Sequence, residues 1–394
     1  MFGNHRRTLR ALAMAALVLL AGSLTACTQP GTSSTTCGNI DATGVTSIAV
    51  IQGNRQNTLT TPPAQVLCFV ERQPQAALHG VVIIPDGIGH RVAWEGRWTP
   101  DPEHPKSEKL ALGEFQRGFA DALAAPATQP EANQLEAVVA AAKALRSDTG
   151  RRLLVINDSL VQTTGRLPLQ NGYLYADTAA VTDELRGFLD QTSVDLTGVE
   201  VVLMASGTAA GTQGELDTET QAKLVGLWTA VLASRGATVT EYTGRHFEPV
   251  AARDLPEVSA VVFKAPEPPS IPCAARLGEE KVGFVPDSTA FIDPAAARDT
   301  ITRVAGELAA CRGELSVIGT TASGGDAAYR KRLSQGRAEA VRTLLAEVTG
   351  RPADTIPAIG VGMDSEYYIH DRRPDGSMDA VTSQLNRSVI VLVR

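Results

Sequence analysis

Residue types that could support chemistry are spread along the chain, but few of them recur at catalytic or metal-binding spacings. The six histidines do not form an H-E-x-x-H zinc pattern. Neither a Gly-x-Ser-x-Gly nucleophile elbow nor a phosphate-binding Gly-x-x-x-x-Gly-Lys-Ser/Thr loop occurs. Asp148-Thr149-Gly150 spells the aspartic-protease triplet, but it occurs only once. We therefore predict that the protein is not an enzyme and uses no cofactor; a hydrolase activity of the N-terminal half is the weaker alternative.

Polar residues follow several apolar runs of strand length. They are Gly53-Asn54-Arg55-Gln56-Asn57, Asp86-Gly87, Asn157-Asp158-Ser159 with Thr163-Thr164, and Ser206-Gly207-Thr208. Ligands of open α/β sheets bind at the carboxyl ends of the strands. Asn54, Arg55, Asp158 and Thr163 are therefore candidates for a protein or ligand contact. The alternative is that they are polar loop residues that cap helices.

The elements that would position these residues alternate between strands and helices. Strands are predicted at 47–52, 79–86, 91–98, 152–158, 199–206 and 238–242, and helices at 106–123, 131–146, 178–190 and 218–235. The runs VVII, LLVI and VVLM are apolar on both faces, which is typical of parallel strands covered by helices on either side. Residues 45–250 are thus predicted to form an α/β domain with an open, mostly parallel sheet.

The strand order and the early edge strand at 91–98 resemble a von Willebrand factor A-type domain. The segment VINDSLVQTTG resembles the strand and loop that carry a metal-site aspartate in that family. The family's ion site also needs an Asp-x-Ser-x-Ser cluster after the first strand, because a hard cation prefers oxygen ligands. This chain has Gly53, Arg55 and Asn57 there. Because an arginine repels a cation, we predict no metal site.

A second domain is predicted beyond a proline-rich segment. PEPPSIPC places four prolines directly before Cys273, and residues 251–278 are predicted to form a stiff linker. Within residues 279–394, a long helical segment carries an apolar stripe made by Leu333, Val341, Leu344 and Leu345 with Ala338 and Ala340. The runs SVIG, PAIGVG and SVIVLV supply a sheet for it to cover. These elements predict an α+β sandwich in βαβαβ order.

Several segments of residues 281–394 resemble the OmpA-like peptidoglycan-binding domain along nearly its whole length. They are KVGFVPDSTAFID, a helix over 294–311, GELSVIGTTASGG, YRKRLSQGRAEAVRTLLAEVTG, DTIPAIGVGMDS and LNRSVIVLV. The family ligand is the diaminopimelate side chain of the cell-wall stem peptide, a zwitterion with one carboxylate and one ammonium. An arginine can bind the carboxylate through two parallel hydrogen bonds, and an aspartate can bind the ammonium.

The resemblance assigns the ligand arginine to Arg337, within Leu333-Ser334-Gln335-Gly336-Arg337-Ala338. The family aspartate is replaced by Ala322, in Gly319-Thr320-Thr321-Ala322. The other site residues that it implies are Thr321, Ser323, Asp326, Arg330, Asn386 and Arg387. Loss of one half of a charged clamp costs about 2–5 kcal/mol when it faces a desolvated partner. Two alternatives follow: a structural Arg337 that pairs with Glu339 or Asp326, and a protein-interaction scaffold that has lost the ligand.

An insertion at 363–387 separates the third strand from the last. It carries Tyr367, Tyr368, His370, Arg372, Arg373 and the turn-forming sequence PDG. In the family this stretch is a loop beside the pocket. The mixture of aromatic and charged residues indicates a surface loop with a contact role. A solvated loop without such a role is the alternative.

The first 27 residues indicate secretion and lipidation. His5-Arg6-Arg7 and Arg10 precede an apolar run, and Leu24-Thr25-Ala26-Cys27 follows it. This tetrapeptide resembles the lipobox of bacterial lipoproteins, in which the cysteine receives a diacylglycerol. We therefore expect a signal peptide at 1–26 and a lipidated Cys27 with a flexible tether at 27–44. The alternatives are an uncleaved transmembrane anchor and ordinary signal cleavage.

Composition and cysteine content agree with an extracytoplasmic protein. The chain is 43% hydrophobic and 20% charged, and its net charge of -7 gives no electrostatic support for nucleic-acid binding. Cys37, Cys68, Cys273 and Cys311 are even in number, and we expect Cys37–Cys68 and Cys273–Cys311 disulfides. Buried free thiols are the alternative. The expected partners are peptidoglycan, the membrane through lipid on Cys27, and an unknown envelope protein.

Overall fold

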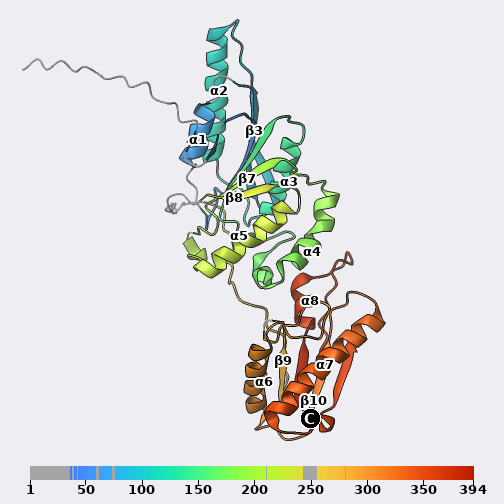
Figure 1. The fold of residues 1–394 in the computed structure, drawn as a ribbon. Coiled ribbons are helices and arrows are strands. Elements are labelled where there is room, and N and C mark those ends of the chain that lie inside the picture. The colour runs from blue at the N-terminus through green and yellow to red at the C-terminus, as the bar shows by residue number, and fades with distance from the viewer. Residues whose placement is uncertain are drawn as a thin grey trace, which may run out of the picture. The chain divides into compact units, whose positions relative to one another are not determined.

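The N-terminal domain is built on a six-stranded sheet (Figure 1). Its strand order is β5 (Gly89–Trp98), β4 (Leu78–Asp86), β3 (Val45–Gln52), β6 (Arg151–Asn157), β7 (Val199–Met204) and β8 (Thr238–Glu241). All neighbours are parallel except β4 and β5, which are antiparallel. Every strand predicted from the sequence for this domain is present, within a few residues of the predicted bounds.

The computed structural model describes residues 36–37, 40–41, 43–58, 62–72, 76–209, 211–242, 255–279 and 281–394. Residues 36–394 belong to one structural unit. The predicted signal peptide, Cys27 and most of the predicted tether lie outside the described residues. None of the helices in the described part of the chain combines the length and apolar content needed to cross a membrane.

Helices cover both faces of this sheet, because successive side chains of a strand point to opposite faces. On β3, Ile48 and Val50 pack toward α1 (Ala64–Glu71) and α2 (Pro105–Ala124). Ala49 and Ile51 pack toward α3 (Gln134–Leu145), α4 (Thr178–Gln191) and α5 (Thr218–Ala233). The two-sided burial explains the uninterrupted apolar runs of the sequence. Helix α1 was not predicted.

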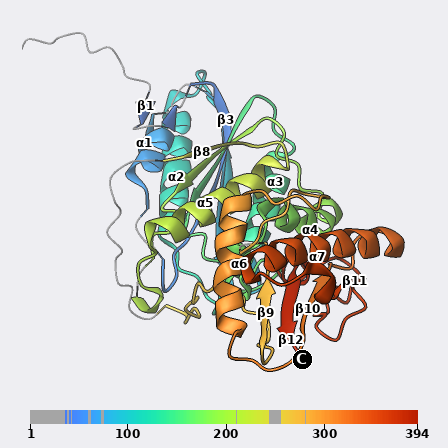
Figure 2. The ribbon, with the colours of Figure 1, turned by 60° about the horizontal axis from the view of Figure 1, so that its bottom comes forward.

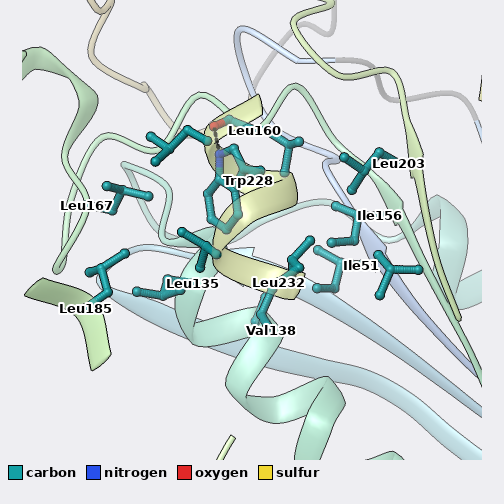
Figure 3. Close-up of a cluster of buried hydrophobic side chains, with 14 of the residues drawn as sticks. Ile51, Leu135, Val138, Ile156, Leu160, Leu167, Leu185, Leu203, Trp228 and Leu232 are labelled. Carbon is teal, nitrogen blue, oxygen red and sulfur yellow. Dashed lines mark hydrogen bonds between the residues drawn. The ribbon is translucent and has the colours of Figure 1, made fainter. Parts of the chain in front are cut away.

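Trp228 of α5 lies at the centre of the larger core (Figure 3). Its ring is fully buried among Leu135, Leu160, Leu167 and other apolar side chains. The indole Nε1 donates a hydrogen bond of 3.0 Å to the Leu160 carbonyl. The ring therefore adds apolar burial without leaving its polar atom unpaired.

The C-terminal domain is a four-stranded sheet covered by two helices (Figure 2). The strand order is β11 (Ala358–Gly362), β10 (Leu315–Thr320), β12 (Val389–Val393) and β9 (Ala274–Leu277). Helices α6 (Pro294–Leu308) and α7 (Ala327–Thr349) share one core with the strands. A Cβ on Gly319 would lie 2.0 Å from the Ser334 carbonyl oxygen, so only glycine lets α7 approach β10 this closely.

The segment at 251–278 differs from a simple linker in its described part. Val258 and Val261 are buried, and Val261 belongs to the core of the N-terminal domain. Strand β9 forms the edge of the C-terminal sheet, where Ala275 pairs with Val391. The prolines therefore connect two anchored pieces, and the free stretch is shorter than the sequence suggests.

One predicted disulfide lies within the described residues and is present. Cys273 and Cys311 are bonded, with Cα atoms 5.8 Å apart, and join the start of β9 to the end of α6. This confirms the predicted pairing of Cys273 with Cys311. Cys68 is also disulfide-bonded. The side chain of Cys37 lies outside the described set, so its pairing with Cys68 stays a prediction.

The insertion at 363–387 packs against the N-terminal domain. Its short helix α8 (Ala380–Asn386) buries Ala380 and Val381 in the core that contains α4 and α5. Arg373 forms an ion pair with Glu184 of α4, with 2.6 Å between Nη2 and Oε1. The backbone N–H of Ala380 donates to the other oxygen of Glu184. The interpretation as a solvated loop is therefore wrong, and the insertion makes its contact within the same chain.

Candidate functional site

A pocket of about 640 Å³ opens beside the N-terminal half of α7. Its walls come from the loop after β9, the loop after β10, α7, the second half of the insertion, and the residue before α4. The residues that line it include Phe284, Asp287, Thr321, Ala322, Tyr329, Arg330, Arg337, Met378 and Arg387. Four of the seven residues predicted for the peptidoglycan site, Thr321, Arg330, Arg337 and Arg387, therefore meet at one pocket.

Arg337 is almost completely buried in the pocket wall, with 5% of its surface exposed. Its Nε donates to the Ser288 carbonyl at 3.0 Å, and the guanidinium carbon lies 5.0 Å from the centre of the Phe284 ring. Burial lowers the pKa of Arg337 from its ordinary value, but an arginine keeps its charge in proteins. No ion pair to Arg337 is found among the described residues.

The alternative partners proposed for Arg337 are engaged elsewhere. Asp326 caps α7 and accepts a hydrogen bond from the Tyr329 N–H. Glu339 accepts from the Gln335 side chain. The interpretation of Arg337 as half of an internal ion pair with either acid is therefore wrong. A buried guanidinium held by one carbonyl and one ring retains unused donors.

Two further polar groups of the pocket wall lack partners within the described structure. The Thr321 hydroxyl and Nη2 of Arg387 are buried without a hydrogen bond. Arg387 contacts Glu279 through Nε, at 3.3 Å. Buried polar groups are normally hydrogen-bonded, so unpaired groups at a pocket suggest a ligand or ordered water.

Ser323, Asp326 and Asn386 do not line the pocket but hold its surroundings in place. The Ser323 carbonyl accepts from Arg330, and the Ser323 N–H donates to Asp371. Asn386 binds the backbone of Ile369 through both its amide atoms. These residues fix the loop after β10 and the insertion, and only indirectly shape the pocket.

Asp371 is a structural residue that was not predicted from the sequence. It is fully buried and accepts hydrogen bonds from the Ser323 N–H, the Tyr368 hydroxyl and the Asn386 amide. Burial alone would raise the pKa of Asp371, but hydrogen bonds from Tyr368 and Ser323 hold it below its ordinary value. Because its oxygens are used internally, Asp371 does not replace the acid absent at Ala322.

Among the described residues, three acids that were not predicted as site residues line the pocket: Asp177, Glu279 and Asp287. Asp287 has a φ of 53° and accepts a hydrogen bond from the Tyr329 hydroxyl at 2.7 Å. That bond raises the pKa of Tyr329. The motif PDST next to Phe284 was the available signal for Asp287. Asp177 comes from a distant part of the chain, and no local pattern marks it.

The polar residues at the strand ends of the N-terminal domain form a packed cluster. Arg55 donates two hydrogen bonds to Asp158, at 2.7 and 2.8 Å, and both residues are buried. Asn54 binds the carbonyls of Leu123 and Ala125. The hollow beside Arg55 and Thr163 has a volume of only about 10 Å³. These residues therefore stabilise the strand ends and do not form a ligand site.

Comparisons with known proteins give matches to the C-terminal part of the chain. Residues 283–380 match the OmpA family. No curated protein matches the chain. The solved structures similar to it include the OmpA-like domain of FopA1 from Francisella tularensis, at 19% identity and a TM-score of 0.23. That match covers 30% of this chain and 70% of the other.

Two other solved structures give matches of the same extent. The cell wall anchor of the T6SS from Pseudomonas aeruginosa is 24% identical, with a TM-score of 0.24, and the match covers 30% of this chain and 79% of that one. The peptidoglycan-associated lipoprotein from Burkholderia pseudomallei is 23% identical, with a TM-score of 0.22 and coverages of 29% and 88%. These values are too low to transfer a function. The family match, over residues 283–380, gives this chain an OmpA-like domain at its C-terminal end.

Proposed function

We propose that the protein is a cell-envelope lipoprotein that attaches non-covalently to peptidoglycan through its OmpA-like domain. The observation that carries this proposal is the buried Arg337, which forms no ion pair among the described residues and lies in the wall of a pocket of about 640 Å³. Glu279 and Asp287 act on the charge of Arg337 without forming an ion pair with it, and a ligand carboxylate would accept two parallel hydrogen bonds from its unused donors. The unpaired Thr321 hydroxyl lies in the same wall.

The charge distribution in the pocket suits a zwitterionic ligand. Arg330, Arg337 and Arg387 supply positive charge, and Asp177, Glu279 and Asp287 supply negative charge. The diaminopimelate side chain expected from the family resemblance carries one carboxylate and one ammonium. The proposed role is therefore binding rather than catalysis. Attachment to the membrane through lipid on Cys27, on the extracytoplasmic side, is part of the same proposal.

Arg337 can be tested by sedimentation of the full chain with purified peptidoglycan in mild detergent. Arg337→Ala removes the charge, and Arg337→Lys keeps the charge but loses the planar pair of donors. We expect Kd to rise at least about 30-fold for Arg337→Ala, which corresponds to about 2 kcal/mol. A smaller rise is expected for Arg337→Lys.

Arg332→Ala is the matched control, since Arg332 is exposed on the same helix and does not line the pocket. Its Kd should equal that of the wild type. Unchanged binding by both Arg337 variants, with normal melting temperatures, would remove Arg337 from the site.

The second candidate function is a protein-interaction scaffold whose OmpA-like domain has lost its ligand. The observation that favours it is Ala322, an apolar residue at the position of the family acid that lines the pocket. If this function is correct, the wild-type protein will not sediment with peptidoglycan at any salt concentration.

We also infer a von Willebrand factor A-like architecture for residues 45–250. The strand order β5-β4-β3-β6-β7-β8 and the antiparallel edge strand β5 support it. Arg55 lies at the strand end where that family binds a cation, and its guanidinium pairs with Asp158. At this position the positive charge is therefore that of the Arg55 side chain rather than that of a bound cation.

A further inference from the structure

The pocket presents an arginine for a ligand carboxylate but no acid at position 322 for a ligand ammonium. Three acids from other positions line the same pocket. They differ in the hydrogen bonds and ion pairs that their carboxylates already form. Their contacts therefore indicate which of them can complete a site for a zwitterion.

Glu279 and Asp287 lie beside two of the pocket arginines, Arg387 and Arg337. Glu279 forms an ion pair with Arg387, with 3.3 Å between the nearest oxygen and Nε. The Asp287 carboxylate accepts a hydrogen bond from the Tyr329 hydroxyl. The carbonyl of the next residue, Ser288, accepts a hydrogen bond from Nε of Arg337. An ammonium bound to either acid would therefore lie next to a guanidinium, and repulsion between the two positive charges would weaken its binding.

Asp177 lines the same pocket as Ala322, and it is held there by the insertion. Met378 packs against the loop that contains Ala322. Its Cε atom is so close to Gly324 that a Cβ built on this glycine would lie 2.9 Å from it. The helix that follows Met378 holds Asp177 in place: the Gln384 side chain accepts a hydrogen bond of 2.8 Å from the Asp177 N–H. The same side chain donates to the Tyr175 carbonyl.

The Asp177 carboxylate keeps one oxygen available. Its Oδ1 caps α4 by accepting from the Ala180 N–H at 2.8 Å. No hydrogen bond or ion pair of Oδ2 is found among the described residues, and the residue is exposed. An ammonium at this rim would gain a charge-assisted hydrogen bond without breaking the cap.

We propose that Asp177 of the N-terminal domain supplies the carboxylate that binds the ammonium group of a zwitterionic ligand in the OmpA-like pocket. The inference rests on the proposed function. The ligand site then contains residues of both domains. Arg337 binds the carboxylate of the ligand, and Asp177 replaces the acid missing at position 322. The insertion at 363–387 then serves to place Asp177 at the pocket rim.

The test measures binding of two stem peptides that end in diaminopimelate to the full chain by calorimetry. One peptide has a free side-chain amine, and in the other this amine is acetylated. Asp177→Asn removes the charge while keeping a good helix cap. Asp217→Asn is the matched control, because Asp217 caps α5 in the same way and does not line the pocket.

For the free-amine peptide we expect Asp177→Asn to raise Kd at least tenfold and Asp217→Asn to leave it unchanged. For the acetylated peptide, Asp177→Asn and wild type should bind equally. Wild-type affinity of Asp177→Asn for the free-amine peptide, or an equal loss for both peptides, overturns the inference. So does a loss that appears instead in Asp287→Asn or Glu279→Gln.

Arg337→Ala separates this inference from the proposed function. If Arg337→Ala weakens binding and Asp177→Asn does not, only the assignment of Asp177 is wrong. If Arg337→Ala binds both peptides as tightly as the wild type, the proposed function fails, and the inference fails with it.

Discussion

Two buried arginines have different roles because their neighbouring side chains differ. Arg55 faces Asp158, and the pair is bidentate and closed to solvent. Arg337 is held by a carbonyl and an aromatic ring and lines a pocket. The first arginine has its counter-ion inside the protein, so it stabilises the fold. The second has unused donors and is suited to bind an anionic ligand.

Replacement of Arg55 should destabilise the N-terminal domain strongly. Arg55→Met leaves Asp158 buried without its counter-charge, which costs about 3–5 kcal/mol. The measurement is urea unfolding followed by tryptophan fluorescence, since Trp94, Trp98 and Trp228 all lie in this domain. Arg186→Ala, which removes an exposed ion pair with Asp183, should change the free energy of unfolding by only about 0–1 kcal/mol. Equal effects of the two substitutions would contradict the structural role of Arg55.

At the scale of elements, the strands and helices followed from hydrophobic periodicity with few errors. The omissions were short: α1 and α8 have 8 and 7 residues, and β9 has 4. Short segments contain too few turns to show a period, and their stability comes from tertiary contacts. Helix α8 is an example, because it depends on Glu184 and on burial of Val381.

The contact between α8 and α4 should respond to pH through Glu184. Burial raises the pKa of Glu184 above its ordinary value of 4.5, although Arg373 and hydrogen bonds from Ala380 and Tyr173 oppose this. The folded state therefore binds the proton more tightly than the unfolded state, and this group's contribution to stability is lost as pH rises through the raised pKa. Wild type should gain stability relative to Glu184→Gln as pH falls from 8 toward 4.5, and the difference should then level off.

Thermal unfolding of the two proteins across this pH range measures the difference. Asp183→Asn, an exposed change on the same helix, serves as the control and should follow the wild type at every pH. A difference between wild type and Glu184→Gln that does not vary with pH would contradict a raised pKa.

At the scale of the whole molecule, membrane attachment is expected to depend on one residue. If Cys27 carries the lipid, Cys27→Ala should move the protein from the membrane fraction to the aqueous fraction, since each buried methylene stabilises attachment by about 0.8 kcal/mol. Incorporation of labelled palmitate, with fractionation, is the measurement. Cys68→Ala, which removes the disulfide of Cys68 but keeps Cys27, should remain in the membrane fraction. Membrane retention of unlabelled Cys27→Ala would indicate a spanning anchor instead.

The sequence by itself predicted most strands and long helices, the Cys273–Cys311 pairing and, through the family resemblance, a site that contains Thr321, Arg330, Arg337 and Arg387. These features depend on periodicity and on motifs that are local in the chain. Tertiary structure alone decided which arginines form an internal ion pair, as Arg55 does with Asp158, and which form none among the described residues, as for Arg337. It also brought Asp177 to the pocket of a domain whose first strand begins almost a hundred residues later. Electrostatic pairing acts through space, so no pattern along the chain predicts it.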